Sequence, residues 1–336
     1  MQEKDAVGIK FFKDKRRFAD LINGHLFGGK EFVKAENVQT EDRSSVLIRN
    51  WRGKLSSKVL MRDIVRFVSV HMKVALVAVE NQSDIHYAMP VRIMTADSVN
   101  YYEQWRETAK EHREKKDLKD AEFLSGFGKK DRLVPVITIV VYFGSEPWDG
   151  PTSLKEMLDL EDMPDELLHA VADYPMQLLE VRSCSYLERF RTDLQYVFGF
   201  IQNAESSEKL KSYVDEHKEI FGNLQEDAYD MISVMTNSSE LESAKEKCKT
   251  SKGGHNVCRA IQEMITEGVQ QGFQDGFQDG FQKGEQQGYQ KGERYTLQLA
   301  KSVFQLRKSG ADYKEIARKC HVLEDKVKEI LEDIEI

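Results

Sequence analysis

The sequence lacks a long apolar run: no stretch approaches the roughly 20 residues that a helix needs to cross a bilayer. Its first residues, M-Q-E-K-D, also lack the apolar segment of a signal peptide. The four cysteines are scattered, without the C-x-x-C or Cys/His spacing of a zinc site. We therefore expect a cytoplasmic protein with reduced thiols, no structural zinc and no membrane partner.

Net positive charge is lacking too, since 49 Lys and Arg stand against 57 Asp and Glu, for a formal charge of −8. The distribution is uneven, however. Residues 1–75 contain 16 basic and 9 acidic side chains. This local excess favours a surface that faces phosphates, although a basic segment is often only a solvated face. At 336 residues the chain is long enough for two or three domains.

Residues 74–83, V-A-L-V-A-V-E-N-Q-S, carry the clearest chemical pattern. Six apolar residues predict a buried strand that ends in acid and amide side chains. Because side chains alternate along a strand, Glu80 and Gln82 point to the same side. Residues 61–70, M-R-D-I-V-R-F-V-S-V, predict a second strand only three residues upstream. The two segments together predict a β-hairpin.

The register of this hairpin decides where its acids lie. If the turn is centred between residues 71 and 72, Asp63 lies opposite Glu80. Directly opposed residues have Cβ atoms roughly 4.5 to 5.5 Å apart, and like charges so placed destabilise a sheet unless a cation neutralises them. The pattern thus indicates a divalent metal site. The alternative is that both acids are solvated, and a one-residue change of register would put them on opposite faces.

The motifs R-D-I-V and V-A-V-E-N-Q-S-D-I-H-Y-A-M-P-V-R in these two segments resemble the nuclease core of the Rpn family of recombination-promoting nucleases and transposases, within the PD-(D/E)XK superfamily. The resemblance covers roughly residues 10–200. It implies an α/β fold with a restriction-endonuclease-like core, in which helices flank a mixed sheet. Asp63 matches the aspartate of the superfamily, Glu80 its second acid, and Gln82 the position where most members carry lysine.

The resemblance implies a DNA endonuclease that hydrolyses phosphodiester bonds, linked to recombination or mobile elements. Asp63 and Glu80 would hold Mg²⁺, or Mn²⁺ in its place, and Gln82 would orient the attacking water without supplying charge. The resemblance also makes Asp20 a candidate metal ligand, since a helical acid at this point can approach the site, although a single helix Asp is more often on the surface. The alternative function is an oligomeric DNA-binding or scaffold protein that keeps the nuclease fold with little or no activity.

Further elements complete the expected nuclease-like domain, residues 1–203. A helix over residues 11–27 precedes the hairpin, Pro90 suits the first turn of a later helix, and helical spacing returns at residues 187–201. Strands are predicted at residues 45–49, 133–143 and 176–181. Residues 204–267 read as a helical connector, whose acids Glu216, Glu226, Asp227 and Asp230 are most simply a solvated face.

Residues 268–294 form the only internal repeat. Glycine recurs at every fourth position from Gly268 to Gly292, and Phe273, Phe277, Phe281 and Tyr289 each follow a glycine. Each glycine costs roughly 1 kcal/mol relative to alanine inside a helix, so an isolated helix is not expected to be stable here. The segment is either a loose linker or packed against a partner, and its strict period favours self-association.

Residues 295–336 predict a C-terminal helical hairpin of helix-turn-helix type. Asp312 is the expected N-cap of its second helix, with Glu315 three residues later. The region contains 8 basic and 8 acidic side chains, and the helix that would enter a DNA groove is acidic. We therefore expect a protein-binding or dimerising hairpin, and a homo-oligomer formed through the glycine repeat and these helices.

Overall fold

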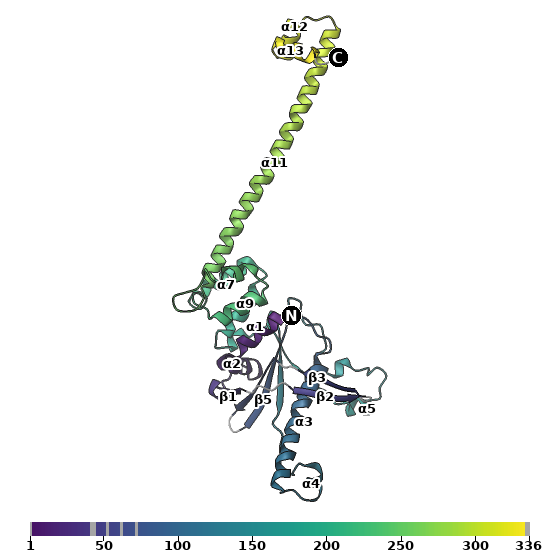
Figure 1. Cartoon of the computed structure of the whole chain (residues 1–336), viewed down its shortest axis with the longest axis vertical. Helices are drawn as coiled ribbons and strands as arrows, with labels where there is room; N and C mark the ends of the chain where they lie inside the picture. The colour runs from purple at the N-terminus through teal and green to yellow at the C-terminus, as the bar shows by residue number, and fades with distance from the viewer. Residues whose placement is uncertain (1, 41–44, 52–53, 61–62, 71–72, 333–336) are drawn as a thin grey trace. The chain divides into compact units, whose positions relative to one another are not determined.

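The computed structural model describes residues 2–40, 45–51, 54–60, 63–70 and 73–332. The chain divides into two compact units, Met1–Glu263 and Met264–Ile336. The first is an α/β unit and the second is helical (Figure 1). Residues 204–263, expected as a connector, thus belong to the first unit. No helix of the described residues is both long and apolar enough to cross a membrane.

A five-stranded mixed sheet forms the centre of the first unit, in the order β1-β4-β5-β6-β7. The β1/β4 and β4/β5 pairs are antiparallel, and the β5/β6 and β6/β7 pairs are parallel. Strands β2 and β3 make a separate antiparallel pair. The strands are β1 (Val38–Thr40), β2 (Ser45–Trp51), β3 (Lys54–Leu60), β4 (Ile64–Val70), β5 (Lys73–Gln82), β6 (Val136–Tyr142) and β7 (Gln177–Glu180).

The strands expected at residues 45–49, 133–143 and 176–181 are confirmed as β2, β6 and β7. Strand β6 is the most apolar of these, and its Ile139, Val140 and Val141 are fully buried. Consecutive residues of a strand face opposite sides, so β6 is covered on both faces, as parallel strands usually are.

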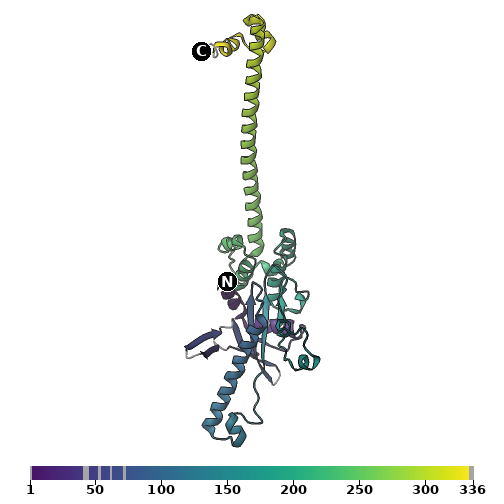
Figure 2. The ribbon, with the colours of Figure 1, turned by 90° about the vertical axis from the view of Figure 1, so that its right-hand side faces the viewer.

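Helix α3 (Met89–Lys115) covers one face of the sheet (Figure 2). Pro90 occupies its first turn, as predicted, where a missing N–H costs no hydrogen bond. Met89 and Ile93 of α3 share a buried cluster with Val140 of β6. The same face of β5 carries Ala78, two residues before Glu80.

The other face is covered by α2 (Lys15–Leu26) and α6 (Leu194–Asn203). The guanidinium of Arg66, on β4, lies 5.0 Å from the ring centroid of Phe18 on α2. Phe143, just after β6, packs edge-on against Phe198 of α6, with ring centroids 6.1 Å apart.

The single helix expected over residues 11–27 is wrong. The structure has two helices there, α1 (Gln2–Phe12) and α2, separated by a short turn. Asp14 explains the break, because its carboxylate accepts the backbone N–H groups of Arg16 (2.7 Å) and Arg17 (3.3 Å) and so caps α2.

Short helices complete the first unit. They are α4 (Asp120–Ser125), α5 (Asp165–Ala170), α7 (Ser207–Glu216), α8 (Lys218–Phe221), α9 (Glu226–Met235) and α10 (Ser239–Ala244), with 3₁₀ turns at Ala35–Asn37, Lys155–Met157 and Leu187–Arg189. The apolar side of α9 is fully buried, including Tyr229 and Ile232.

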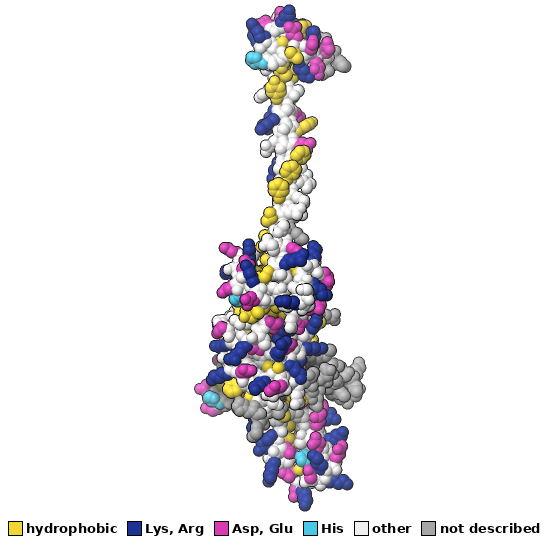
Figure 3. All heavy atoms as spheres, turned by 90° about the vertical axis from the view of Figure 1, so that its left-hand side faces the viewer, with side chains coloured by type: hydrophobic (Ala, Val, Ile, Leu, Met, Phe, Trp, Pro, Cys, Tyr) yellow, Lys and Arg dark blue, Asp and Glu magenta, His cyan; other side chains and the backbone are white. Residues whose placement is uncertain are grey.

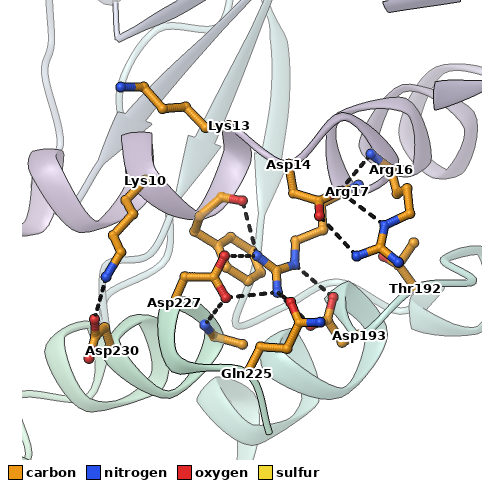
Figure 4. A network of polar contacts seen from close by, with 12 residues as sticks. Lys10, Lys13, Asp14, Arg16, Arg17, Thr192, Asp193, Gln225, Asp227 and Asp230 are labelled. Atoms are coloured by element: carbon orange, nitrogen blue, oxygen red, sulfur yellow. Dashed lines mark hydrogen bonds and ion pairs between the residues drawn. The ribbon is translucent and has the colours of Figure 1, made fainter. Parts of the chain in front are cut away.

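A buried charge cluster ties the first helices of the unit to its last ones (Figure 4). Arg17 is only 1% exposed. Its Nε and Nη2 donate to Asp193, at 2.8 and 2.7 Å, and its Nη1 and Nη2 donate to Asp227, at 2.5 and 3.0 Å. The guanidinium also lies over the ring of Phe11, 4.3 Å from its centroid. We call Arg17, Asp193 and Asp227 the Arg17 cluster.

The expectation of a solvated acidic face at residues 226–230 is therefore wrong for two of its members. Asp227 belongs to the Arg17 cluster, and Asp230 accepts from Lys10 at 3.0 Å and from Lys245 at 2.5 Å. These carboxylates stabilise contacts between α9 and distant segments.

The glycine repeat lies within a single long helix, α11 (Val257–Lys308). The repeat is thus helical rather than a loose linker. A Cβ added at any of its seven glycines would have no other atom within 4 Å. Figure 3 shows apolar side chains standing out along this helix.

The C-terminal hairpin follows α11 as expected, with α12 (Tyr313–Cys320) and α13 (Glu324–Glu332). Asp312 caps α12 by accepting the backbone N–H of Glu315 at 2.8 Å, which confirms the predicted cap. The fully buried side chains of Val303, Ile316 and Val327 form the core of the hairpin.

Candidate functional site

The β4/β5 hairpin has the register that the sequence predicted. Ile64 of β4 pairs with Val79 of β5, and the ladder continues to Val70 opposite Lys73. Asp63 directly precedes β4, so the same register places it opposite Glu80. The turn residues 71–72 lie outside the described part of the chain. Both acids therefore lie at the same end of the hairpin, where Asp63 contacts Asn81 and Glu80 contacts Arg92.

Asp63 is half-buried and anchored to the neighbouring strand. Its Oδ2 accepts the backbone N–H of Asn81 at 2.7 Å and lies 3.4 Å from the side-chain Nδ2 of the same residue. Burial raises the pKa of Asp63, and the negative charge of Asp5 on α1 adds to the increase. The Asn81 hydrogen bonds and the positive charge of Arg92 oppose it. A carboxyl with a raised pKa is one whose charge the fold does not fully neutralise.

Glu80 is 3% exposed and faces α3. Its Oε2 accepts from Nη2 of Arg92, in the first turns of α3, at 3.1 Å. Because Arg92 also acts on the pKa of Asp63, one guanidinium lies near both acids. The sequence reasoning missed Arg92. Its position two residues after Pro90 was the available signal, since the start of that helix follows the acidic strand directly.

Asn81 was also missed as part of the site. It is 4% exposed, and its Oδ1 has no hydrogen-bond partner among the described residues. Helix α1 lies against it: a Cβ on Gly8 would be 2.9 Å from Asn81 Cγ. The Asn81 amide is therefore covered by α1, on the face of β5 opposite the Glu80 side chain.

Gln82 is the last residue of β5 and is half-buried. Its backbone carbonyl accepts the N–H of Phe143 at 2.8 Å, which fixes the end of the strand against β6. Strand alternation puts its side chain on the same side as Glu80. Gln82 thus follows Glu80 on the same face, at the end of β5.

Asp20 lies in α2 and is 6% exposed. Its Oδ2 accepts the backbone N–H of Thr192 and the Thr192 hydroxyl, both at 2.7 Å, and both of its oxygens accept the N–H of Arg191, at 3.0 and 2.9 Å. Through these hydrogen bonds Asp20 holds residues 191–192, just before α6, against α2, so its role is structural.

The side-chain oxygens of these residues are the kind of ligand that Mg²⁺ prefers. This ion takes hard oxygen ligands, commonly from one or two carboxylates, and fills other positions with water and substrate phosphate. Asp63 and Glu80 would supply two carboxylates, whereas the Asn81 side chain points to the other face of β5. Within the described ranges no group of three or more His, Cys, Asp or Glu side chains is placed to hold a metal. Two carboxylates are the smallest protein donor set that an Mg²⁺ ion commonly uses, with water and phosphate as its other ligands.

Comparisons of the chain with protein-family models, with curated proteins and with solved structures found no match.

Proposed function

We propose that the protein is a Mg²⁺-dependent DNA endonuclease whose site consists of Asp63, Glu80 and Gln82. The observation that supports it most is the register of the β4/β5 hairpin, which, continued by one pair beyond Ile64 and Val79, would set Asp63 opposite Glu80. Burial raises the pKa of Asp63 and Glu80 is 3% exposed, so the fold retains two poorly solvated carboxylates. Ionised Asp63 is therefore costly to the fold, whereas the charge of Glu80 is balanced by Arg92.

The mixed sheet flanked by helices agrees with the fold that the resemblance to the PD-(D/E)XK superfamily implies. The exposed side chains of Lys13, Lys15 and Arg16 add positive charge near the start of the chain. Contacts to DNA phosphates need such charge, and they make binding weaker as the salt concentration rises.

Each side chain has a role in this proposal. Bound Mg²⁺ would act as a Lewis acid on a phosphate oxygen and lower the pKa of its water. Asp63 and Glu80 would hold the ion, and the amide of Gln82 would orient the attacking water by hydrogen bonding. Arg92 supplies the positive charge that Gln82 lacks, since it already lies 3.1 Å from Glu80.

The test is Mg²⁺-dependent nicking of supercoiled DNA by the purified protein. Asp63→Asn and Glu80→Gln keep the size of each side chain and remove one ligand charge, so each should reduce nicking by roughly 100-fold or more. Gln82→Lys should keep or increase the activity. Asp84→Asn is the matched control, because Asp84 is an exposed acid just after β5.

Undiminished nicking by folded Asp63→Asn or Glu80→Gln protein would refute the site. A wild type that binds DNA but cuts neither DNA nor RNA would favour the second candidate, an oligomeric DNA-binding or scaffold protein with a nuclease-like fold. The glutamine at position 82 and the ion pair that already engages Glu80 favour this alternative.

A further inference from the structure

The repeat in α11 exposes a row of aromatic rings. Phe273, Phe277, Phe281 and Tyr289 are 75%, 70%, 65% and 77% exposed. We call these four residues the aromatic stripe. Side chains four positions apart are neighbours on a helix, so the rings follow the glycines as a row that turns gradually around the helix and is interrupted by Glu285. Exposed apolar rows of this kind mark interaction surfaces.

A second row lies on the opposite side of the glycines, formed by the residues that precede them. Its charges change sign along the helix: Asp275 and Asp279 come first, and Lys283 and Lys291 follow. Within one chain, Lys283 Nζ lies 2.6 Å from Asp279 Oδ2. The segment is therefore acidic in its first half and basic in its second half along this row.

We propose that residues 268–292 pair with the same residues of a second copy of the chain, in antiparallel orientation and centred on Phe281. A parallel pair in register that packs through the glycines would put the charged row of each copy beside the aromatic stripe of the other. The antiparallel pair puts Asp279 of each copy beside Lys283 of the other. It also brings Phe281 against its own counterpart and Phe273 against Tyr289 of the second copy.

The surface available is enough for a dimer. An aromatic side chain has roughly 150–250 Å² to bury, so four that are about 70% exposed offer about 500 Å² per copy. Two copies would bury about 1,000 Å² through these rings alone, close to the lower limit for specific interfaces. The open space around the glycines lets two backbones approach closely, and the polar Gln, Asp and Lys of the repeat suit pairing in water.

The spacing also fixes how the two helices wind. A four-residue period exceeds the 3.6 residues of a helical turn, so the stripe drifts by about 40° per repeat. Periods longer than 3.6 residues give right-handed winding. The two helices of the pair should therefore wind around each other in the right-handed sense.

The first experiment measures the mass of the full-length protein in solution by light scattering. The wild type should be dimeric at micromolar concentration. Phe277→Ala/Phe281→Ala should weaken association at least about tenfold, because central aromatic anchors dominate such interfaces. Gln274→Ala/Gln278→Ala is the control, since these residues lie away from the rings and the charged row, and it should stay dimeric. A monomeric wild type would overturn the proposal.

The second experiment tests the orientation by thiol cross-linking. Residues 269 and 293 are about 36 Å apart along the helix, too far for one disulfide. Val269→Cys alone and Glu293→Cys alone should not link to themselves through the new thiol, whereas a mixture of the two should give the 269–293 product. Phe281→Cys should link to itself. Efficient self-linking of Val269→Cys would show a parallel pair and overturn the antiparallel one. None of these results depends on nuclease activity.

Discussion

Arg17 should be one of the most sensitive positions in the first unit. The Arg17→Ala variant removes a guanidinium that makes two-pronged ion pairs with both Asp193 and Asp227. Removing one partner of a buried pair costs about 3–5 kcal/mol, because the remaining charge is left without compensation. Each carboxylate here is 23% exposed, so water recovers part of its solvation, and we expect about 3–4 kcal/mol.

This loss in the free energy of unfolding can be measured as a lower melting temperature. Entropies of unfolding of about 2 cal/mol/K per residue make 1 kcal/mol worth about 2 °C in a unit of this size. Arg17→Ala should therefore lower the melting temperature of the first unit by about 5–10 °C, measured by circular dichroism at neutral pH. Arg16→Ala is the matched control: its side chain is 66% exposed and pairs with Asp14 at the surface, so its loss should cost less than about 1 kcal/mol. Equal shifts in the two variants would refute the reasoning.

Two further predictions concern the acids. Burial raises the pKa of Asp63 in the folded protein, so its ionised form destabilises the fold at all pH values above that pKa, and the penalty disappears below the ordinary value of about 3.9. Asp63→Asn should therefore raise the melting temperature in EDTA at pH 7 but not at pH 3.5. Mg²⁺ should stabilise this variant less than it stabilises the wild type. Equal Mg²⁺ shifts in the two proteins would place the ion elsewhere. Asp20→Ala should cost about 2–3 kcal/mol in urea unfolding, because three donors at residues 191–192 lose their acceptor. Asp20→Asn should keep the full Mg²⁺ response, and a reduced response would show that Asp20 is a ligand.

Local patterns predicted the elements and the register around the site. The apolar run before Glu80 and the short connection between the two strands were enough to predict that Ile64 pairs with Val79. Side chains alternate between the two faces of a strand, so few registers remain once one face is buried. Pro90 and Asp312 marked helix starts for reasons that act within one turn. These predictions depend only on residues close together in sequence, and the structure confirms them.

Contacts between distant segments could not be predicted in this way. Asp227 looked like one of several surface acids because its partner is 210 residues away. Asn81 and Arg92 gained their place beside Asp63 only once helices α1 and α3 had packed on opposite faces of the sheet. A single sequence shows which side chains carry charge, but not which of them the tertiary structure will bring together.

The Arg17 cluster also has a consequence for how the protein is made. Helices α1 and α2 leave the ribosome well before the partners of Arg17, because Asp193 and Asp227 are 176 and 210 residues later in the chain. At about 5–20 residues per second, synthesis leaves Arg17 and the apolar rings beside it without their partners for roughly 10–40 s. The Arg17 cluster can form only after α9 has emerged, so until then the apolar side of α1 and α2 stays exposed on the nascent chain.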